Sequence, residues 1–161
     1  AILYLQLISS RITMRPRNFK VIVILLISLT DMSYSQDRFD EIKRLAEKGD
    51  VVAQMNLGNK YYVGEDVPQN FTEAVKWYRM AARQGNAVAQ NNLGMMYSIG
   101  SGLPKNFIRA YVWASVAAAQ GNEQAMANRN VVADELTRVQ LARAQRMAMR
   151  CFDSNYRDCG R

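Results

Sequence analysis

A segment of 36 residues occurs twice in tandem, and this repeat restricts the possible folds more than any other feature of the chain. The first copy begins at Gly49 and the second at Gly85. The residues of the first copy that recur at this offset in the second are Gly49, Ala53, Gln54, Leu57, Gly58, Tyr61, Gly64, Pro68, Asn70, Ala74, Trp77, Ala81 and Ala82. A fixed period of this length is typical of stacked repeats, because one unit cannot bury its apolar face without its neighbours.

Each copy predicts two antiparallel helices. Ala53, Leu57 and Tyr61 lie one helical turn apart, so they share one face of a first helix. Gly64 ends that helix, since glycine readily takes the left-handed conformation found after a helix C-terminus. Asn70 then begins the second helix as its N-cap. The sequence therefore predicts an all-α fold, namely an α/α solenoid of antiparallel helix pairs with a period of 36 residues.

Two glycines and two tryptophans at matching positions predict how these helices pack. Gly58 and Gly94 fall inside the first helices, where glycine is less stable than alanine by about 1 kcal/mol. Their recurrence indicates that a neighbouring helix passes too close for a side chain. Trp77 and Trp113 recur in the second helices among small residues, so we expect both indoles in the core rather than in a ligand site.

The repeated pattern also resembles a known family. Residues 53–64 and 89–100 both read Ala-Gln-x-x-Leu-Gly-x-x-Tyr-x-x-Gly, and each is followed by Ala-x-x-Trp and Ala-Ala before the next glycine. This pattern resembles the Sel-1-like repeat, a relative of the tetratricopeptide repeat, and the resemblance covers residues 49–121 fully. One departure is Asp66, which stands where the family usually has a second loop glycine, as Gly102 does in the second copy. The resemblance implies a superhelix whose first helices line the concave side.

The flanking sequences read as caps of the stack. Residues 36–48 align with the end of a second helix and have a polar outer face, as terminal repeats do. After Gly121 the third copy decays, and Thr137 with Gln140 forms a capping box that begins a last helix. The predicted segments are an upstream extension at 1–13, a signal peptide at 14–35, an N-terminal capping helix at 36–48, repeat 1 at 49–84, repeat 2 at 85–120, a degenerate repeat with a C-terminal capping helix at 121–150, and a disulfide-bonded tail at 151–161.

The signal peptide is predicted from the order of its parts. Basic residues follow Met14, an apolar run extends over 21–29, and small residues precede a cleavage point between Ser35 and Gln36. An uncleaved membrane anchor is the alternative, although the run is shorter than the roughly 20 residues that cross a bilayer. No cysteine lies near the cleavage point, so a lipid anchor is not expected. The hypothesis is an exported protein, periplasmic or secreted, that contacts a membrane only through an uncleaved signal segment.

The net charge of +7 depends partly on this leader. Of 21 basic and 14 acidic residues, 4 basic and 1 acidic lie in residues 1–35, which leaves 17 and 13 and a net charge of +4. The remaining basic residues are scattered along the sequence, without a stripe interleaved with aromatic residues. We therefore expect no nucleic-acid partner.

The two cysteines, Cys151 and Cys159, lie in the tail. In an exported protein an isolated pair at this spacing favours a disulfide, whose small loop contributes about 2–3 kcal/mol in the chain-entropy model. A metal site is the alternative, but it would need further ligands and the chain has no histidine. The lack of histidine also removes Ser-His and Cys-His nucleophile pairs. We expect no catalytic residue, no metal and no cofactor.

The face of the first helices away from their helical neighbours is the predicted binding surface. The candidate peptide-binding groove consists of Val52, Met55, Asn59, Tyr62, Val88, Asn91, Met95 and Ser98. Methionine adapts its shape and asparagine can bond to a peptide backbone, which suits another protein or an extended peptide. The leading hypothesis is thus a non-catalytic protein-binding adaptor or scaffold. The alternatives are a plain solvent-exposed surface, a β-lactam-binding or weakly β-lactamase-like protein, as described for cysteine-rich relatives, and a regulator of envelope or exopolysaccharide assembly.

Overall fold

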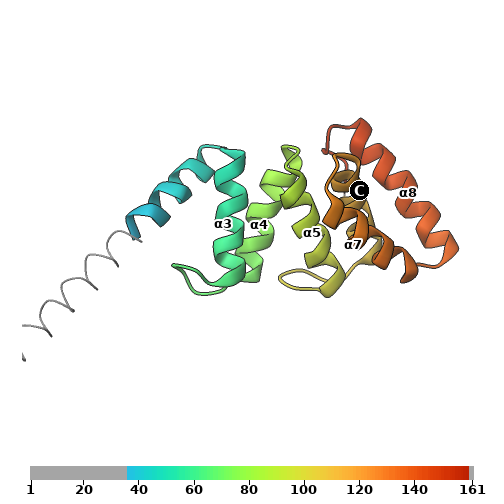
Figure 1. The fold of residues 1–161 in the computed structure, drawn as a ribbon, viewed down its shortest axis with the longest axis horizontal. Coiled ribbons are helices and arrows are strands. Elements are labelled where there is room, and N and C mark those ends of the chain that lie inside the picture. Colours follow the sequence, from blue (N-terminus) through green and yellow to red (C-terminus); the bar gives the residue numbers. More distant parts are fainter. Residues whose placement is uncertain (1–35, 160–161) are drawn as a thin grey trace, which may run out of the picture. The chain divides into compact units, whose positions relative to one another are not determined.

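The computed structural model describes residues 36–159, and the predicted extension 1–13 and signal peptide 14–35 lie outside them. The chain divides into two units, residues 1–38 and 39–161, and both repeats belong to the second. A helix at 36–47 comes first. The helices that follow are α3 (Val51–Val63), α4 (Phe71–Arg83), α5 (Ala87–Ile99), α6 (Phe107–Ala119), α7 (Glu123–Asp134) and α8 (Arg138–Asp153), as Figure 1 shows. The predicted all-α repeat fold is therefore confirmed.

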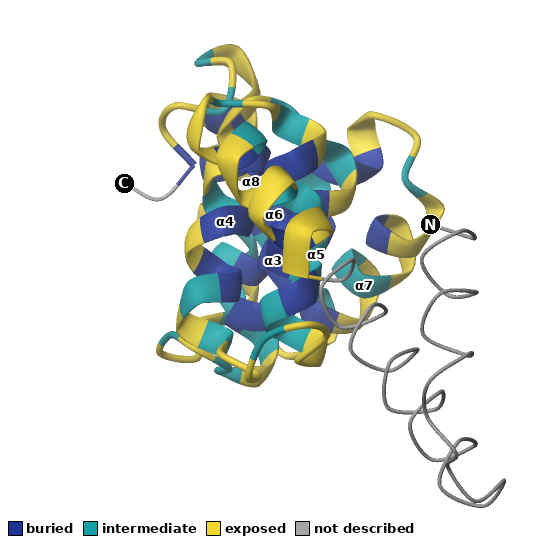
Figure 2. Cartoon of the chain, turned by 90° about the vertical axis from the view of Figure 1, so that its left-hand side faces the viewer, coloured by how far each residue is buried: buried dark blue, intermediate teal, exposed yellow. Residues whose placement is uncertain are grey.

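Successive helices pack against one another through the second unit. α3 packs against α4, α4 against α5, α5 against α6 and α6 against α7. The last helix, α8, also packs against α6, so α6 contacts both α7 and α8. The side of each helix that meets its neighbours carries the buried residues in Figure 2. The core includes both predicted tryptophans, Trp77 at 5% and Trp113 at 4% exposure.

The same N-cap recurs at the start of each first helix. The side chains of Asp50 and Asn86 accept a hydrogen bond from the backbone N–H of the third residue of α3 and α5, and Asn122 does the same for α7. Such a bond satisfies one of the free N–H groups of a helix N-terminus. The third copy thus keeps the helix start of the repeat and the alanine at Ala125, although most of its other repeat residues are lost. The capping box predicted at Thr137 is also present.

The close approach predicted at the helix glycines is confirmed, but the group that approaches is a helix backbone in the second copy and an aromatic ring in the first. A Cβ at Gly94 would lie 3.1 Å from the backbone oxygen of Ala110 and 3.2 Å from the nitrogen of Ala114, both in α6. A Cβ at Gly58 would lie 2.6 Å from the ring of Tyr78 in α4. The second copy has alanine, Ala114, at the position of Tyr78, so its helix backbones come closer together.

A buried glutamine in each repeat joins three helices. Gln54 in α3 and Gln90 in α5 are 1% and 0% exposed. Gln90 donates from Nε2 to the carbonyl of Ala82 at 3.0 Å, near the end of α4, and its Oε1 accepts from Gln120 at 2.6 Å, after the end of α6. Gln54 makes the equivalent two bonds one repeat earlier, at 3.0 and 2.8 Å. The repeated glutamine therefore ties each first helix to the second helix before it and the second helix after it.

In the loop after α3, an aspartate stands where the second copy has a glycine, and its carboxylate forms an ion pair. Asp66 has a φ of 64°, close to the 71° of Gly102 at the equivalent position, so the departure from the repeat pattern is accommodated. The Asp66 carboxylate lies 2.6 Å from Nζ of Lys60, which is only 8% exposed. Burial lowers the pKa of Lys60, but bonds to Asp66 and Glu65 outweigh burial and the pKa is raised overall. The second copy has Met96 in place of Lys60 and needs no such partner.

Candidate functional site

The predicted groove residues lie on α3 and α5, and their exposure differs. Val52 and Val88, which are equivalent in the two copies, are 59% and 46% exposed. Asn91 is 8% exposed and therefore belongs to the interior. The other predicted residues are half-buried: Met55, Asn59, Tyr62, Met95 and Ser98.

The two asparagine amides of this set are bonded within the stack. Asn59 Oδ1 accepts from the Tyr78 hydroxyl at 2.7 Å and from Asn92 at 3.4 Å. Asn91 Oδ1 accepts from Asn128 of α7 at 2.9 Å. These bonds link neighbouring helices, so the oxygens contribute to helix packing. The apolar members of the set are the ones left with exposed surface.

Tyr78 offers a test of this packing. Burial raises the pKa of its phenol to about 12, although a hydrogen bond with Asn92 lowers it somewhat. In the folded protein the pKa of this phenol lies above the ordinary value near 10. The neutral, buried phenol therefore contributes fully to the stability of the fold below about pH 10, and this contribution is lost as the pH rises through about 12. We expect ultraviolet titration to show a phenol that ionises near pH 12 and is missing in Tyr78→Phe. Ionisation of every tyrosine near pH 10 would contradict this expectation.

A small hollow of about 70 Å³ lies between α5, α6 and α7. Its lining residues are Gly94, Met95, Ser98, Ala110, Ala114, Asn128, Val131 and Val132. Met95 and Ser98 were predicted from the sequence, whereas the α7 side was not. The third copy has lost most of the repeat pattern, so only its N-cap asparagine and Ala125 could have shown that α7 continues the same surface. Val131 of α7 is 66% exposed beside this hollow.

The tail is held by the predicted disulfide between Cys151 and Cys159, which is present in the structure. Both cysteines are buried, at 0% and 2% exposure. After α8 the chain turns back, and the backbone N–H of Tyr156 donates to the carbonyl of Cys151 at 2.8 Å. Tyr156 has a φ of 65°, a left-handed conformation that is rare for a bulky residue. The disulfide and this turn bring the tail back to the helices.

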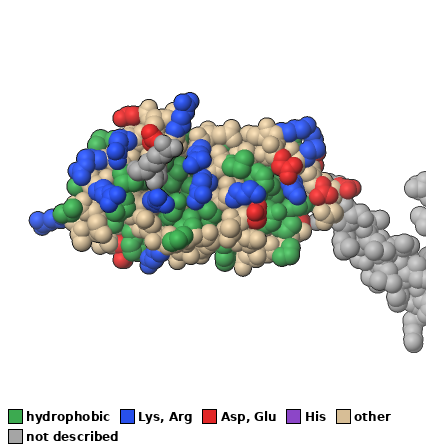
Figure 3. All heavy atoms as spheres, turned by 180° about the vertical axis from the view of Figure 1, so that it is seen from behind, with side chains coloured by type: hydrophobic (Ala, Val, Ile, Leu, Met, Phe, Trp, Pro, Cys, Tyr) green, Lys and Arg blue, Asp and Glu red, His purple; other side chains and the backbone are tan. Residues whose placement is uncertain are grey.

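A second and larger hollow, of about 230 Å³, lies where the tail meets the repeats. Its lining residues come from α4, α5, α6 and the tail: Arg79, Arg83, Tyr97, Arg109, Trp113, Tyr156, Arg157 and Cys159. Figure 3 shows Lys and Arg side chains gathered next to hydrophobic ones on the face turned away in Figure 1. The sequence indicated scattered basic residues, and this is wrong for these four arginines. The i, i+4 spacing of Arg79 and Arg83 was the one visible signal, because the others are brought close only by folding.

Within residues 36–159 no helix is both long and apolar enough to span a bilayer. In the same part of the chain, no three His, Cys, Asp or Glu side chains are grouped in a way that could hold a metal ion.

Comparison with known proteins identifies the repeats. Residues 51–86 and 87–122 match the family model of the Sel1 repeat. The structure is similar to that of a protective antigen present in uropathogenic Escherichia coli strains, which displays an SLR fold, with a TM-score of 0.72, 30% sequence identity and coverage of 75% of this chain and 26% of that chain. It is also similar to a Sel1 repeat protein from Oxalobacter formigenes, with a TM-score of 0.52, 42% identity and coverage of 52% and 24%. No curated protein matches the chain in sequence.

The chain spans about a quarter of the length of each of these two structures. Sel1 repeats generally mediate contacts between proteins, and the repeat scaffold is generally non-catalytic. The matched residues coincide with α3 to α6, together with the glutamines that join the helix pairs. Sequence pattern, helix pairing and structural likeness therefore agree that residues 51–122 of the chain form two Sel1 repeats.

Proposed function

We propose that the chain is a non-catalytic adaptor of the cell envelope that binds an extended segment of another protein on the face of its first helices. The observation that carries this proposal is the hollow between α5 and α7, where Met95 and Ser98 lie opposite Val131. The general role of Sel1 repeats in protein contacts supports it. The partner would lie along the first helices, over the surface predicted from the sequence.

The chemistry of this face suits a peptide with apolar side chains. Val88 and Val131 are exposed on neighbouring first helices, at 46% and 66%, so burying them would remove apolar surface from water. Met95 is half-buried and can adapt its shape to a side chain that enters the hollow. The side chains of half-buried Asn59 and buried Asn91 link α3 to α5 and α5 to α7 beneath this surface, so the face does not depend on a partner for its packing.

Export is part of the proposal. Disulfides persist mainly in oxidising compartments such as the periplasm or the extracellular space, and the one between Cys151 and Cys159 is closed. The predicted signal peptide at 14–35 agrees with this location. An intact mass that begins at or near Gln36 would support cleavage, whereas retention of residues 21–29 in the exported protein would contradict it.

The test is affinity capture from the envelope fraction with matched variants. Val88→Glu with Val131→Glu places charge on the proposed face at two exposed positions, so folding should be retained. We expect a protein captured by the wild type to be lost with this variant, because a buried carboxylate without a partner opposes binding.

The control has the same charge change elsewhere. Val139→Glu with Met149→Glu alters two exposed apolar residues of α8, at 80% and 60% exposure. This control should capture the partner as the wild type does. Equal capture by both variants would show that the first-helix face is not the binding surface.

A further inference from the structure

We propose that the arginine-lined hollow at the tail is a second binding site, which takes an acidic peptide segment through its carboxylate groups. Its lining residues include none of the residues of the first-helix face. The inference therefore does not rest on the adaptor proposal, and either can fail without the other.

The charge of the hollow is one-sided. Four of its lining residues are arginines and none is acidic. Arg83 and Arg157 are exposed, and neither forms an ion pair with any residue in the described part of the chain. A guanidinium stays protonated at every physiological pH, so the lining of the hollow keeps its positive charges. An anion bound between them would relieve their repulsion.

Tyr97 organises the inner part of the hollow. Its hydroxyl accepts from Arg79 of α4 at 3.4 Å, and the guanidinium of Arg109 in α6 lies 5.8 Å from the centre of its ring. A cation at that distance is attracted by the aromatic ring. Tyr97 and Trp113 are themselves buried, at 6% and 4% exposure. Arg79 and Arg109 are therefore held next to buried aromatic side chains, whereas Arg83 and Arg157 are exposed to solvent.

The tail completes the site. Tyr156 and Arg157 lie between the two bonded cysteines, so the disulfide determines where both side chains are placed. A Cβ at Gly85 would lie 3.1 Å from the ring of Tyr156, so the tail approaches the end of α4 where no side chain intervenes. The strained left-handed conformation of Tyr156 is retained in this turn, as is common at binding sites. The site therefore depends on the oxidised form of the cysteines.

Carboxylates fit this site better than phosphate. Guanidinium groups bind carboxylates through two parallel hydrogen bonds. The hollow of about 230 Å³ is larger than a single small ion requires. The CH₂ groups of glutamate could contact Trp113 and Tyr156 while their carboxylates reach the arginines.

The test measures the binding of a fluorescein-labelled tetraglutamate peptide to the full chain by fluorescence anisotropy at low salt. In Arg83→Gln with Arg157→Gln we expect the affinity to fall about tenfold or more, because two charge-assisted contacts are lost. Both residues are exposed, so circular dichroism should show an unchanged fold. Labelled tetraglutamine should not bind. Failure of the wild type to bind tetraglutamate would overturn the inference.

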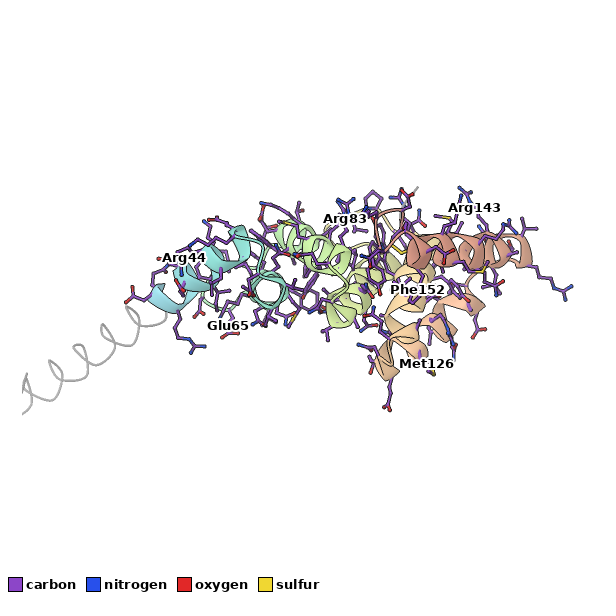
Figure 4. All side chains as sticks on the ribbon, turned by 90° about the horizontal axis from the view of Figure 1, so that it is seen from above. Arg44, Glu65, Arg83, Met126, Arg143 and Phe152 are labelled. Atoms are coloured by element: carbon purple, nitrogen blue, oxygen red, sulfur yellow. A yellow bond between two sulfur atoms is a disulfide. The ribbon has the colours of Figure 1, made fainter. Side chains whose placement is uncertain are left out.

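The control variant removes the same charge outside the hollow. Arg138→Gln with Arg143→Gln changes two exposed residues of α8, and Arg143 lies on the same side of the ribbon as Arg83, opposite Met126, in Figure 4. We expect this variant to change the affinity by less than about twofold, since distant surface charges contribute little. An equal loss in both double variants would mean general attraction to a basic surface and would overturn the site.

Two further measurements separate the remaining explanations. Cys151→Ala with Cys159→Ala changes no charge, but it should weaken tetraglutamate binding as much as the arginine variant because the tail is released. Unchanged binding would show that the tail takes no part.

Competition then compares glutarate with inorganic phosphate. Displacement of the peptide by phosphate at lower concentrations than glutarate would contradict the assignment of carboxylate as the ligand.

Discussion

Replacing Gln90 by alanine is expected to lower the free energy of unfolding by about 3 kcal/mol. The side chain is fully buried and bonds at the same time to Ala82 and Gln120, near the ends of two different helices. Alanine would leave the Ala82 carbonyl without this donor and would leave a void between three helices. Chemical denaturation followed by circular dichroism measures the effect.

A glutamine in the next first helix provides the control. Gln124 is exposed, and its side chain donates to Asn128 one turn away in the same helix. We expect Gln124→Ala to change the stability by less than about 0.5 kcal/mol. Should Gln90→Ala cost no more than this control, the glutamine bonds would not be what joins the repeats.

Removing the disulfide is expected to have the second large effect. Cys151→Ala with Cys159→Ala should lower the free energy of unfolding by about 2–3 kcal/mol, because the unfolded chain loses a closed loop. Both sulfurs lie in the core, so the tail residues between them would also lose their fixed position. Denaturation of the variant beside the oxidised wild type gives the difference.

Reduction of the wild type is the independent check on this result. It opens the same loop without a change of sequence, so the two losses of stability should agree. An unchanged denaturation midpoint after full reduction would show that the tail contributes nothing to the fold.

Much of the fold could be predicted because its signals are local in the sequence. The spacing of Leu57 and Tyr61 predicted the first helix, Gly64 its end and Asn70 the next start, and all three features are present. Gly94 likewise indicated a close helix contact. Each of these residues affects only the backbone near it in the sequence or the neighbouring helix of the same repeat. Two copies of the repeat were therefore enough to reveal its role.

The candidate sites were predicted less completely because they depend on contacts across repeats. The helical pattern predicts that Asn91 faces outward, but its side chain is bonded to Asn128 of a helix that has lost most of the repeat pattern. The face of α7 with Val131 was missed for the same reason. A helical pattern states which residues share a side, but it does not state how far the next helix covers that side.

The sequence by itself determined the repeat, the helix ends and the pairing of the cysteines, since these follow from backbone preferences, apolar spacing and the small number of possible partners. Only the tertiary structure decided where charge is concentrated. Arg79 and Arg157 are 78 residues apart in the chain, and they line one hollow because a disulfide returns the tail to the helices. Electrostatic interaction depends on distance in space, and that distance is set by packing rather than by order along the chain.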